Sequence, residues 1–296
     1  MKKLSDSARI FEKIFWVFLF INPFLDIING LYINLVQGVG VLDVKTISTL
    51  GVTPSLLVRM MMLVVFAGYL LIVRDRKSIL TALPMGLAWL MSMVAEWATL
   101  GSVQLFLDTQ YTARFCYNIV ILMVYSRVFS LRWGSDGKDL LRRLNGIASF
   151  TLAVLSLSIL ISAVAGVGYS TYADRVGYRG SRGFFYAGND ITAVLALLLP
   201  LNVASLMQME TNTPLPRRVL FVLAGAFGGN ALMIIGSKTA FIAAGFTYGV
   251  MLLCALVSLL RKQKEAFVGY LWAAGGAALV LAFSCCCPRE LCGKAL

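Results

Sequence analysis

The chain has no histidine and little charge. Only 14% of its 296 residues are charged, whereas 59% are hydrophobic. Soluble domains typically carry about 25% charged residues, so this composition excludes an ordinary soluble globule. The lack of histidine removes imidazole both as a general base and as a metal ligand. No segment alternates with the strict period of two that membrane-barrel strands require, which excludes that architecture as well.

Apolar segments of membrane-spanning length run through the whole chain. A hydrocarbon core about 30 Å thick needs about 20 apolar residues per helix. The sequence therefore predicts an all-α, polytopic integral membrane helical bundle with about nine transmembrane helices, forming a single domain over residues 1–284. The predicted helices span residues 14–36, 55–73, 79–99, 112–131, 146–168, 188–208, 219–236, 239–260 and 267–284. The first lacks an A-x-A cleavage pattern and is polar in its middle, so we expect it to be retained.

The net charge of +12 first suggests a nucleic-acid partner, but the distribution of the basic residues argues against one. With nine helices and a cytoplasmic N-terminus, most basic residues fall on the inner side, in the ranges 2–13, 74–77, 127–143, 217–218 and 261–264. Such a bias is the positive-inside rule of membrane proteins. The basicity therefore predicts topology and contact with anionic membrane lipids, with no nucleic acid.

A smaller set of cations falls on the predicted outer side, where the rule does not favour them. These are Lys45, Arg59, Arg114, Arg175, Arg179, Arg182 and Lys238. A charge at bilayer depth costs about 2.5–3.5 kcal/mol, so it usually faces a cavity or a partner. Taken singly, each has a structural alternative, such as snorkelling or an ion pair between Glu96 and Arg114. Jointly they indicate an outward-facing anion site, and the arginine fork suits phosphate.

The segment 178–192 combines these arginines with a predicted helix start. Asn189 or Asp190 precedes the apolar run from Ile191 and is the predicted N-cap. The free N–H groups of such a helix start can bind phosphate. For the aromatic residues at 184–186 two interpretations stay open: an interfacial belt, or contact with a sugar face or a lipid tail.

Two motifs in this part of the chain carry a resemblance to a known family. The first motif, which precedes an apolar helix, is Arg182-Gly183-Phe184-Phe185-Tyr186-Ala187-Gly188-Asn189. The second, separated from it by two apolar segments, is Ile235-Gly236-Ser237-Lys238-Thr239-Ala240. Together they resemble signatures of the O-antigen ligase and polymerase superfamily, in its Gram-positive-like form. Asn22-Pro23-Phe24-Leu25-Asp26 is a weaker third match. The resemblance covers mainly residues 178–260.

The resemblance implies a glycosyltransferase of the bacterial cytoplasmic membrane, acting as a polysaccharide polymerase or ligase. Its substrate would be an undecaprenyl-diphosphate-linked glycan at the outer leaflet, with no cofactor and no metal. Arg182 and Lys238 would contact the diphosphate, and the outward cations Arg179, Arg114 and Arg59 are further candidate contacts because of their placement. Gly188, Asn189, Asp190 and Ser237 would shape the loop and the helix caps. Glu96 is the candidate acid/base residue.

The C-terminal end departs from the family pattern. The family's large outer loop, with its histidine, has no counterpart, and the Cys-rich tail 285–296 fits neither a helix nor that loop. We interpret this tail as a frame-shifted or truncated gene end, and we expect little glycan transfer by this chain alone. Cys116 and Cys254 lie in predicted helices as small apolar residues. The alternatives are a transporter or flippase that binds the same lipid-linked glycan, and an inactive fragment of the enzyme.

Overall fold

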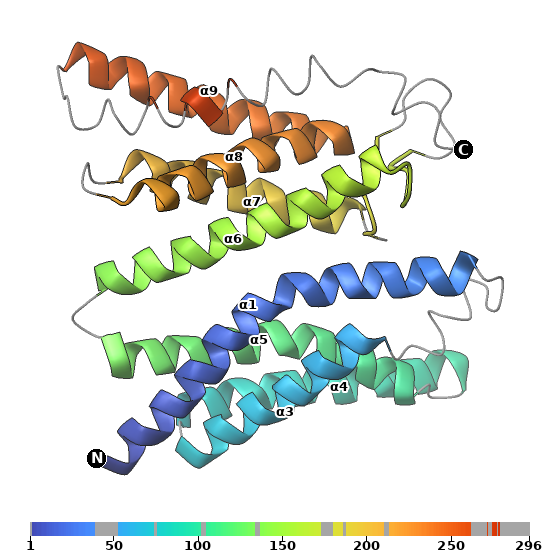
Figure 1. Cartoon of the computed structure of the whole chain (residues 1–296). Helices are drawn as coiled ribbons and strands as arrows, with labels where there is room; N and C mark the ends of the chain where they lie inside the picture. Colours follow the sequence, from blue (N-terminus) through green and yellow to red (C-terminus); the bar gives the residue numbers. More distant parts are fainter. Residues whose placement is uncertain are drawn as a thin grey trace. The chain divides into compact units, whose positions relative to one another are not determined.

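The computed structural model describes residues 2–38, 53–73, 76–101, 105–133, 137–172, 180–185, 188–209 and 213–261, with 271, 274–276 and 278. In these residues the chain forms α-helices and a single isolated β-bridge, so the predicted all-α class is confirmed. The helices are α1 (Lys2–Gly38), α3 (Pro54–Val73), α4 (Arg76–Leu100), α5 (Leu105–Trp133), α6 (Gly137–Val164), α7 (Gly188–Met207), α8 (Leu215–Ile235) and α9 (Lys238–Leu260) (Figure 1).

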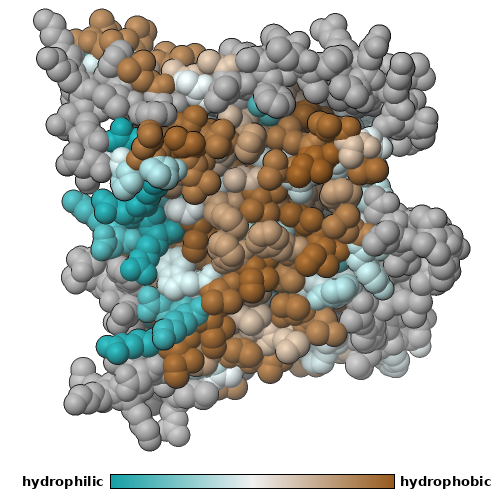
Figure 2. Space-filling model, in the orientation of Figure 1, coloured by the Kyte–Doolittle hydropathy of each residue, from teal (hydrophilic) through white to brown (hydrophobic). Residues whose placement is uncertain are grey.

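Each of these helices overlaps one predicted segment, but α1, α5 and α6 begin well before the predicted residues 14, 112 and 146. The ninth predicted segment, 267–284, falls for the most part outside the described residues, so the count of nine stays a prediction. Within the described residues, six helices are long and apolar enough to cross a membrane, and α5 contains a shorter apolar stretch, Phe115–Ser130. Hydrophobic side chains cover much of the helix surface seen in Figure 2. The chain is therefore a multi-pass membrane protein.

The chain divides into two compact units. The first unit comprises residues 1–18 and 36–140, and the second comprises 19–35 and 141–296. Helix α1 therefore contributes its first half to one unit and its second half to the other. Pro23 lies inside α1, where it removes one backbone donor from the helix ladder.

Aromatic side chains hold the first unit together. Phe15 of α1 and Phe129 of α5 meet edge-on with ring centroids 5.1 Å apart. Phe66 of α3 and Tyr125 of α5 meet in the same way at 5.8 Å. Aromatic pairs of this geometry contribute about 0.5–1.5 kcal/mol beyond their buried area. The aromatic residues of α1, α3 and α5 therefore form the core of this unit.

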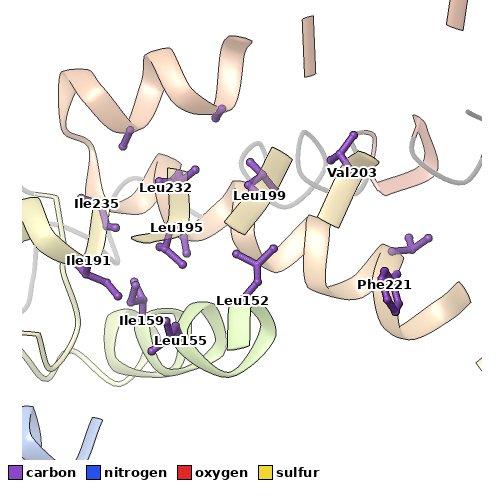
Figure 3. Packing of buried hydrophobic residues seen from close by; sticks show 14 of the residues in the cluster. Leu152, Leu155, Ile159, Ile191, Leu195, Leu199, Val203, Phe221, Leu232 and Ile235 are labelled. Atoms are coloured by element: carbon purple, nitrogen blue, oxygen red, sulfur yellow. The ribbon is translucent and has the colours of Figure 1, made fainter. Parts of the chain in front are cut away.

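The second unit packs α6, α7, α8 and α9 around an aliphatic core (Figure 3). Its inward residues recur every three or four positions, which places them on one helix face: Leu152, Leu155 and Ile159 on α6, and Ile191, Leu195, Leu199 and Val203 on α7. Helix α8 adds Leu232 and Ile235, together with glycines that allow a close approach. A Cβ on Gly228 would lie 2.8 Å from Leu152 Cδ1. Because lipid is as apolar as the core, such packing rather than the hydrophobic effect holds membrane helices together.

Two polar contacts cross this core. Asn202 Nδ2 of α7 donates to Ser149 Oγ of α6 at 2.9 Å. The Tyr248 hydroxyl of α9 donates to the carbonyl oxygen of Gly225 in α8 at 3.0 Å. Hydrogen bonds between helices in a bilayer contribute about 0.6 kcal/mol on average. They fix how the helices face one another and so support the site at one end of the unit.

Candidate functional site

A short antiparallel strap lies at one end of the second unit. We call residues 168–172 and 180–185 the strap. Tyr169 N donates to Gly183 O at 2.7 Å, and Arg182 N donates back to Tyr169 O at 3.0 Å. A third bond joins Thr171 N to Gly180 O at 2.6 Å. These bonds align the two strands of the strap so that Tyr169 faces Arg182.

The strap follows directly from the way in which α6 ends. Val167 N donates to Ser162 O at 3.0 Å, and Gly166 N donates to Ala163 O at 3.3 Å. This pair of bonds is the Schellman pattern that ends a helix and reverses the chain. The reversal sends residues 168–172 back over the end of α6.

Glycines let the strap lie directly on the helix ends. A Cβ on Gly183 would lie 2.9 Å from Ser162 Oγ in α6, and its φ of 65° also favours glycine. A Cβ on Gly180 would collide with the carbonyl oxygen of Ile235 in α8. Ser181 N donates to Ile234 O at 3.0 Å, which satisfies one of the last carbonyls of α8. The strap is therefore tied to the C-terminal ends of α6 and α8.

Helix α1 supports the strap from another direction. A Cβ on Gly30 would collide with the carbonyl oxygen of Phe184. Phe185 is only 7% exposed and belongs to the apolar core. Of the two interpretations of the aromatic residues at 184–186, neither an interfacial belt nor a sugar contact describes Phe185, because its ring packs inside the unit. Tyr186 lies outside the described residues.

Arg182 is held between an aromatic ring and the start of α7. Its Cζ lies 5.4 Å from the centroid of the Tyr169 ring, within the range of a cation–π contact. A Cβ on Gly188, the first residue of α7, would lie 3.1 Å from Arg182 Cδ. The side chain is half-buried. The structure therefore fixes this cation beside a helix N-terminus.

Helix α7 begins where the predicted segment 188–208 begins, but its N-cap is not where the sequence predicts. Its first residue is Gly188, so Asn189 and Asp190 lie in the first helical turn and the predicted N-cap at either residue is wrong. Both side chains are exposed. Asp190 places a carboxylate where the helix dipole favours negative charge. The Thr192 hydroxyl donates to Gly188 O at 2.7 Å within the same turn.

Helix α9 begins at the same end of the unit, immediately after α8. Gly236 ends α8 with a φ of 69°, and its N–H donates to Leu232 O. Ser237 caps α9, because its Oγ accepts a hydrogen bond from Ala240 N at 3.1 Å. Lys238, the first residue of α9, is exposed. We call this end, with the strap, the starts of α7 and α9 and the ends of α6 and α8, the strap end.

The starts of α7 and α9 bring positive potential to the strap end, and the ends of α6 and α8 bring negative potential to it. A helix N-terminus is equivalent to about half a positive charge. The starts of α7 and α9 meet here with Arg182 and Lys238. A cation beside a helix start is disfavoured by about 0.3–1 kcal/mol unless negative charge is near. Asp190 supplies one negative charge, and a bound anion would supply more.

The structure locates the remaining predicted site residues only in part. Arg59 lies in α3 and Glu96 in α4, both in the first unit, half-buried and engaged in interactions of their own. Arg114 belongs to α5, but its side chain lies outside the described residues, as does the whole of Arg179. The predicted pairing of Glu96 with Arg114 stays a prediction for the same reason.

No group of three or more His, Cys, Asp or Glu side chains that could hold a metal ion occurs within the described residues. Cys116 and Cys254 are half-buried free thiols inside helices, and the Cys-rich tail 285–296 lies outside the described part of the chain. The described residues of the strap end include the cations Arg182 and Lys238, the carboxylate of Asp190 and the N-termini of α7 and α9.

Tyr169 and Gly30 were not predicted as parts of this site. Tyr169 faces Arg182 only because the strap pairs its strands, and Gly30 comes from a helix far away in the sequence. The one local signal was the set of glycines at 168, 180 and 183, which indicates tight backbone packing without naming the partners.

The comparisons with known proteins give a family. The family model described as O-antigen ligase like membrane protein matches residues 8–289, which is nearly the whole chain. Neither the curated proteins nor the solved structures compared with the chain contain a match.

Proposed function

Because the chain belongs to the family of O-antigen ligase-like membrane proteins, we propose that the strap end binds the diphosphate of an undecaprenyl-diphosphate-linked glycan. The reaction would transfer the glycan to an acceptor in the synthesis of a cell-surface polysaccharide, as polymerase or ligase. The family supports lipid-linked glycans as the class of substrate. Arg182, fixed between the Tyr169 ring and the start of α7, is the observation that carries the proposal.

The chemistry needs a site for developing negative charge. In the transfer, the bond between the anomeric carbon and the phosphate oxygen breaks, and its electron pair stays on the diphosphate. The acceptor hydroxyl oxygen forms the new bond and gives up its proton. Preorganised cations and N–H groups around the leaving group lower the barrier, a contribution that is often the largest single one in an enzyme. Arg182, Lys238 and the N–H groups of α7 would supply it without a metal.

Arginine suits this role better than lysine. Its planar guanidinium donates two parallel hydrogen bonds to phosphate oxygens and stays charged. Lys238 would act as a point charge, aimed by the Ser237 cap at the start of α9. Arg179 remains a further proposed diphosphate contact, whereas Arg59, Arg114 and Glu96 belong to the first unit and stay predictions from the sequence.

We further propose that the strap end faces outward from the cytoplasmic membrane of a bacterium. Basic residues of the second unit gather at its opposite end, where α6 and α8 begin and α9 ends: Arg142, Arg143, Arg217, Arg218 and Arg261. The positive-inside rule assigns that end to the cytoplasm. A lipid-linked glycan at the outer leaflet would then reach Arg182 directly.

Binding of undecaprenyl diphosphate by the purified protein in detergent tests the proposal, with native mass spectrometry as the readout. A hydrogen bond to a charged group contributes about 1.5–3 kcal/mol, so Arg182→Ala should weaken binding about ten- to a hundred-fold. Arg182→Lys should weaken it less, because the charge remains while the fork is lost. The matched control is Arg217→Ala, since Arg217 also lies over a ring, that of Phe221, at the opposite end.

Thermal unfolding of the same preparations separates binding from structure. If Arg182 serves only the fold, Arg182→Ala lowers the unfolding midpoint while the affinity of the folded fraction stays unchanged. That result would remove Arg182 from the site. Release of undecaprenyl diphosphate from a lipid-linked glycan in the presence of an acceptor glycan would identify a transferase, whereas binding without release is expected of a carrier and of an inactive fragment alike.

A further inference from the structure

Tyr169 and Arg182 form a pair of which only Arg182 belongs to the sequence motif. The motif begins at Arg182, whereas Tyr169 lies on the opposite strand of the strap. Two backbone bonds join the strands at this point, from Tyr169 N to Gly183 O and from Arg182 N to Tyr169 O. The Tyr169 backbone thus fixes the register, and its ring receives the Arg182 guanidinium at 5.4 Å.

The other side of Arg182 is equally restricted. Phe185 N donates to Arg182 O at 3.3 Å, so Arg182 opens a tight turn that sends Phe185 into the core. On the side of α7, Arg182 Cδ lies close to Gly188. A Cβ added to Gly188 would be only 3.1 Å from Arg182 Cδ. The arginine stem is therefore confined between a ring and the first residue of a helix.

This placement opposes the helix dipole. The start of α7 carries partial positive charge, and a guanidinium beside it is disfavoured. A flexible arginine would turn away towards water. A cation–π contact offsets that tendency, because the negative face of the ring attracts the guanidinium. The ring therefore provides a physical reason for Arg182 to stay where an anion can contact both the guanidinium and the N–H groups of α7.

We infer that Tyr169 is a positioning residue, which holds the Arg182 guanidinium at the start of α7. The guanidinium and the N–H groups of α7 can then contact one phosphate group together. This inference rests on the proposed function, because it assigns a second residue to the same diphosphate site. The ring acts through Arg182 and makes no contact of its own with the ligand. Its effect on affinity should therefore vanish when Arg182 is absent.

A double-mutant cycle tests the inference, with undecaprenyl diphosphate in detergent as the probe and undecaprenol as the ligand without phosphate. Tyr169→Phe keeps the ring face and should bind within about two-fold of the wild type. Tyr169→Leu should bind about three- to ten-fold more weakly, as expected for a lost cation–π contact. In the Arg182→Ala background, Tyr169→Leu should change affinity less than two-fold, because the contact is already gone. Undecaprenol binding should be the same in all variants.

Gly188→Ala provides an independent variant that keeps Tyr169. The added methyl would displace the Arg182 stem and should weaken diphosphate binding, again only when Arg182 is present. This variant decides the question if Tyr169→Leu fails to fold.

The outcomes separate the two proposals. If Arg182→Ala binds like the wild type, the proposed function is wrong at this site. If Arg182→Ala weakens binding while Tyr169→Leu and Gly188→Ala do not, the positioning role is overturned and the diphosphate site stands. Two other results would also overturn it. One is that Tyr169→Leu lowers the affinity equally with and without Arg182. The other is that Tyr169→Phe lowers the affinity as much as Tyr169→Leu does. In those cases the ring would act on the fold, or the hydroxyl on the ligand.

Discussion

Asn202 and Ser149 are joined inside the second unit by a hydrogen bond of 2.9 Å from Nδ2 to Oγ. Both side chains are fully buried, so the bond links α7 to α6 where no water competes. The other amide atom, Asn202 Oδ1, has no hydrogen-bond partner within the described residues and faces Gly225 of α8, where a Cβ would lie 2.9 Å away. One side chain thus sets the spacing of three helices.

Removing this bond should destabilise the protein modestly. We expect Asn202→Ala to cost about 1 kcal/mol, since the lost hydrogen bond is partly offset by removing an unsatisfied carbonyl. Ser149→Ala in the same cycle should show coupling of about 0.6 kcal/mol. Thermal unfolding midpoints in detergent measure both, with the exposed Asn189→Ala as control. Strictly additive effects would show that the bond contributes nothing.

The close approach of α6 and α8 leads to a second prediction about stability. Gly228→Ala should destabilise the protein by about 1–3 kcal/mol, because the added methyl group would press on the fully buried Leu152. Gly245→Ala in α9 is the matched control, since a Cβ there meets no described atom within 4 Å. Unfolding midpoints should fall for the first variant only. If both variants melt alike, the α6–α8 contact tolerates a wider spacing.

The start of α9 depends on its cap. Ser237→Ala should destabilise the protein by about 0.5–2 kcal/mol, because Ala240 N loses its acceptor. Ser237→Asp should retain the stability, since aspartate is an equally good cap. Thr239→Ala in the same turn serves as the exposed control. The cap would be dispensable if the alanine variant unfolded at the wild-type midpoint.

The two ends of the second unit should lie on opposite sides of the membrane. In a chain whose native cysteines are replaced, Asn189→Cys should react with an impermeant maleimide added outside intact cells. Arg217→Cys should react only after permeabilisation, because its end carries the basic residues. Both positions are exposed in the structure. Labelling of the Arg217→Cys variant from outside intact cells would show that the protein has the opposite orientation.

The helices could be predicted because the bilayer leaves the backbone few choices. Each spanning segment must satisfy its own N–H and C=O groups, so a long apolar run becomes a helix whatever packs beside it. This argument held for the eight segments between 14–36 and 239–260. Helix ends were predicted less well: α6 begins at Gly137 rather than at residue 146, because a helix can continue through polar residues beyond its apolar run. The contact of Arg182 with Gly188, the first residue of α7, is encoded by no local pattern either.

The sequence singled out Arg182, Ser237 and Lys238 through the two motifs and through cations placed against the predicted topology. The residues that surround them in the structure could not be predicted from the sequence. Tyr169 meets Arg182 through strap pairing, and Gly30 admits the Phe184 carbonyl from a helix far away along the chain. Phe185, three residues after Arg182 in the same motif, turns into the core because Arg182 opens a turn. Sequence alone determined the membrane-spanning helices and the cations, since composition decides burial in lipid. Only the tertiary structure decided what holds Arg182 in place, because contacts between distant segments depend on how helix ends meet.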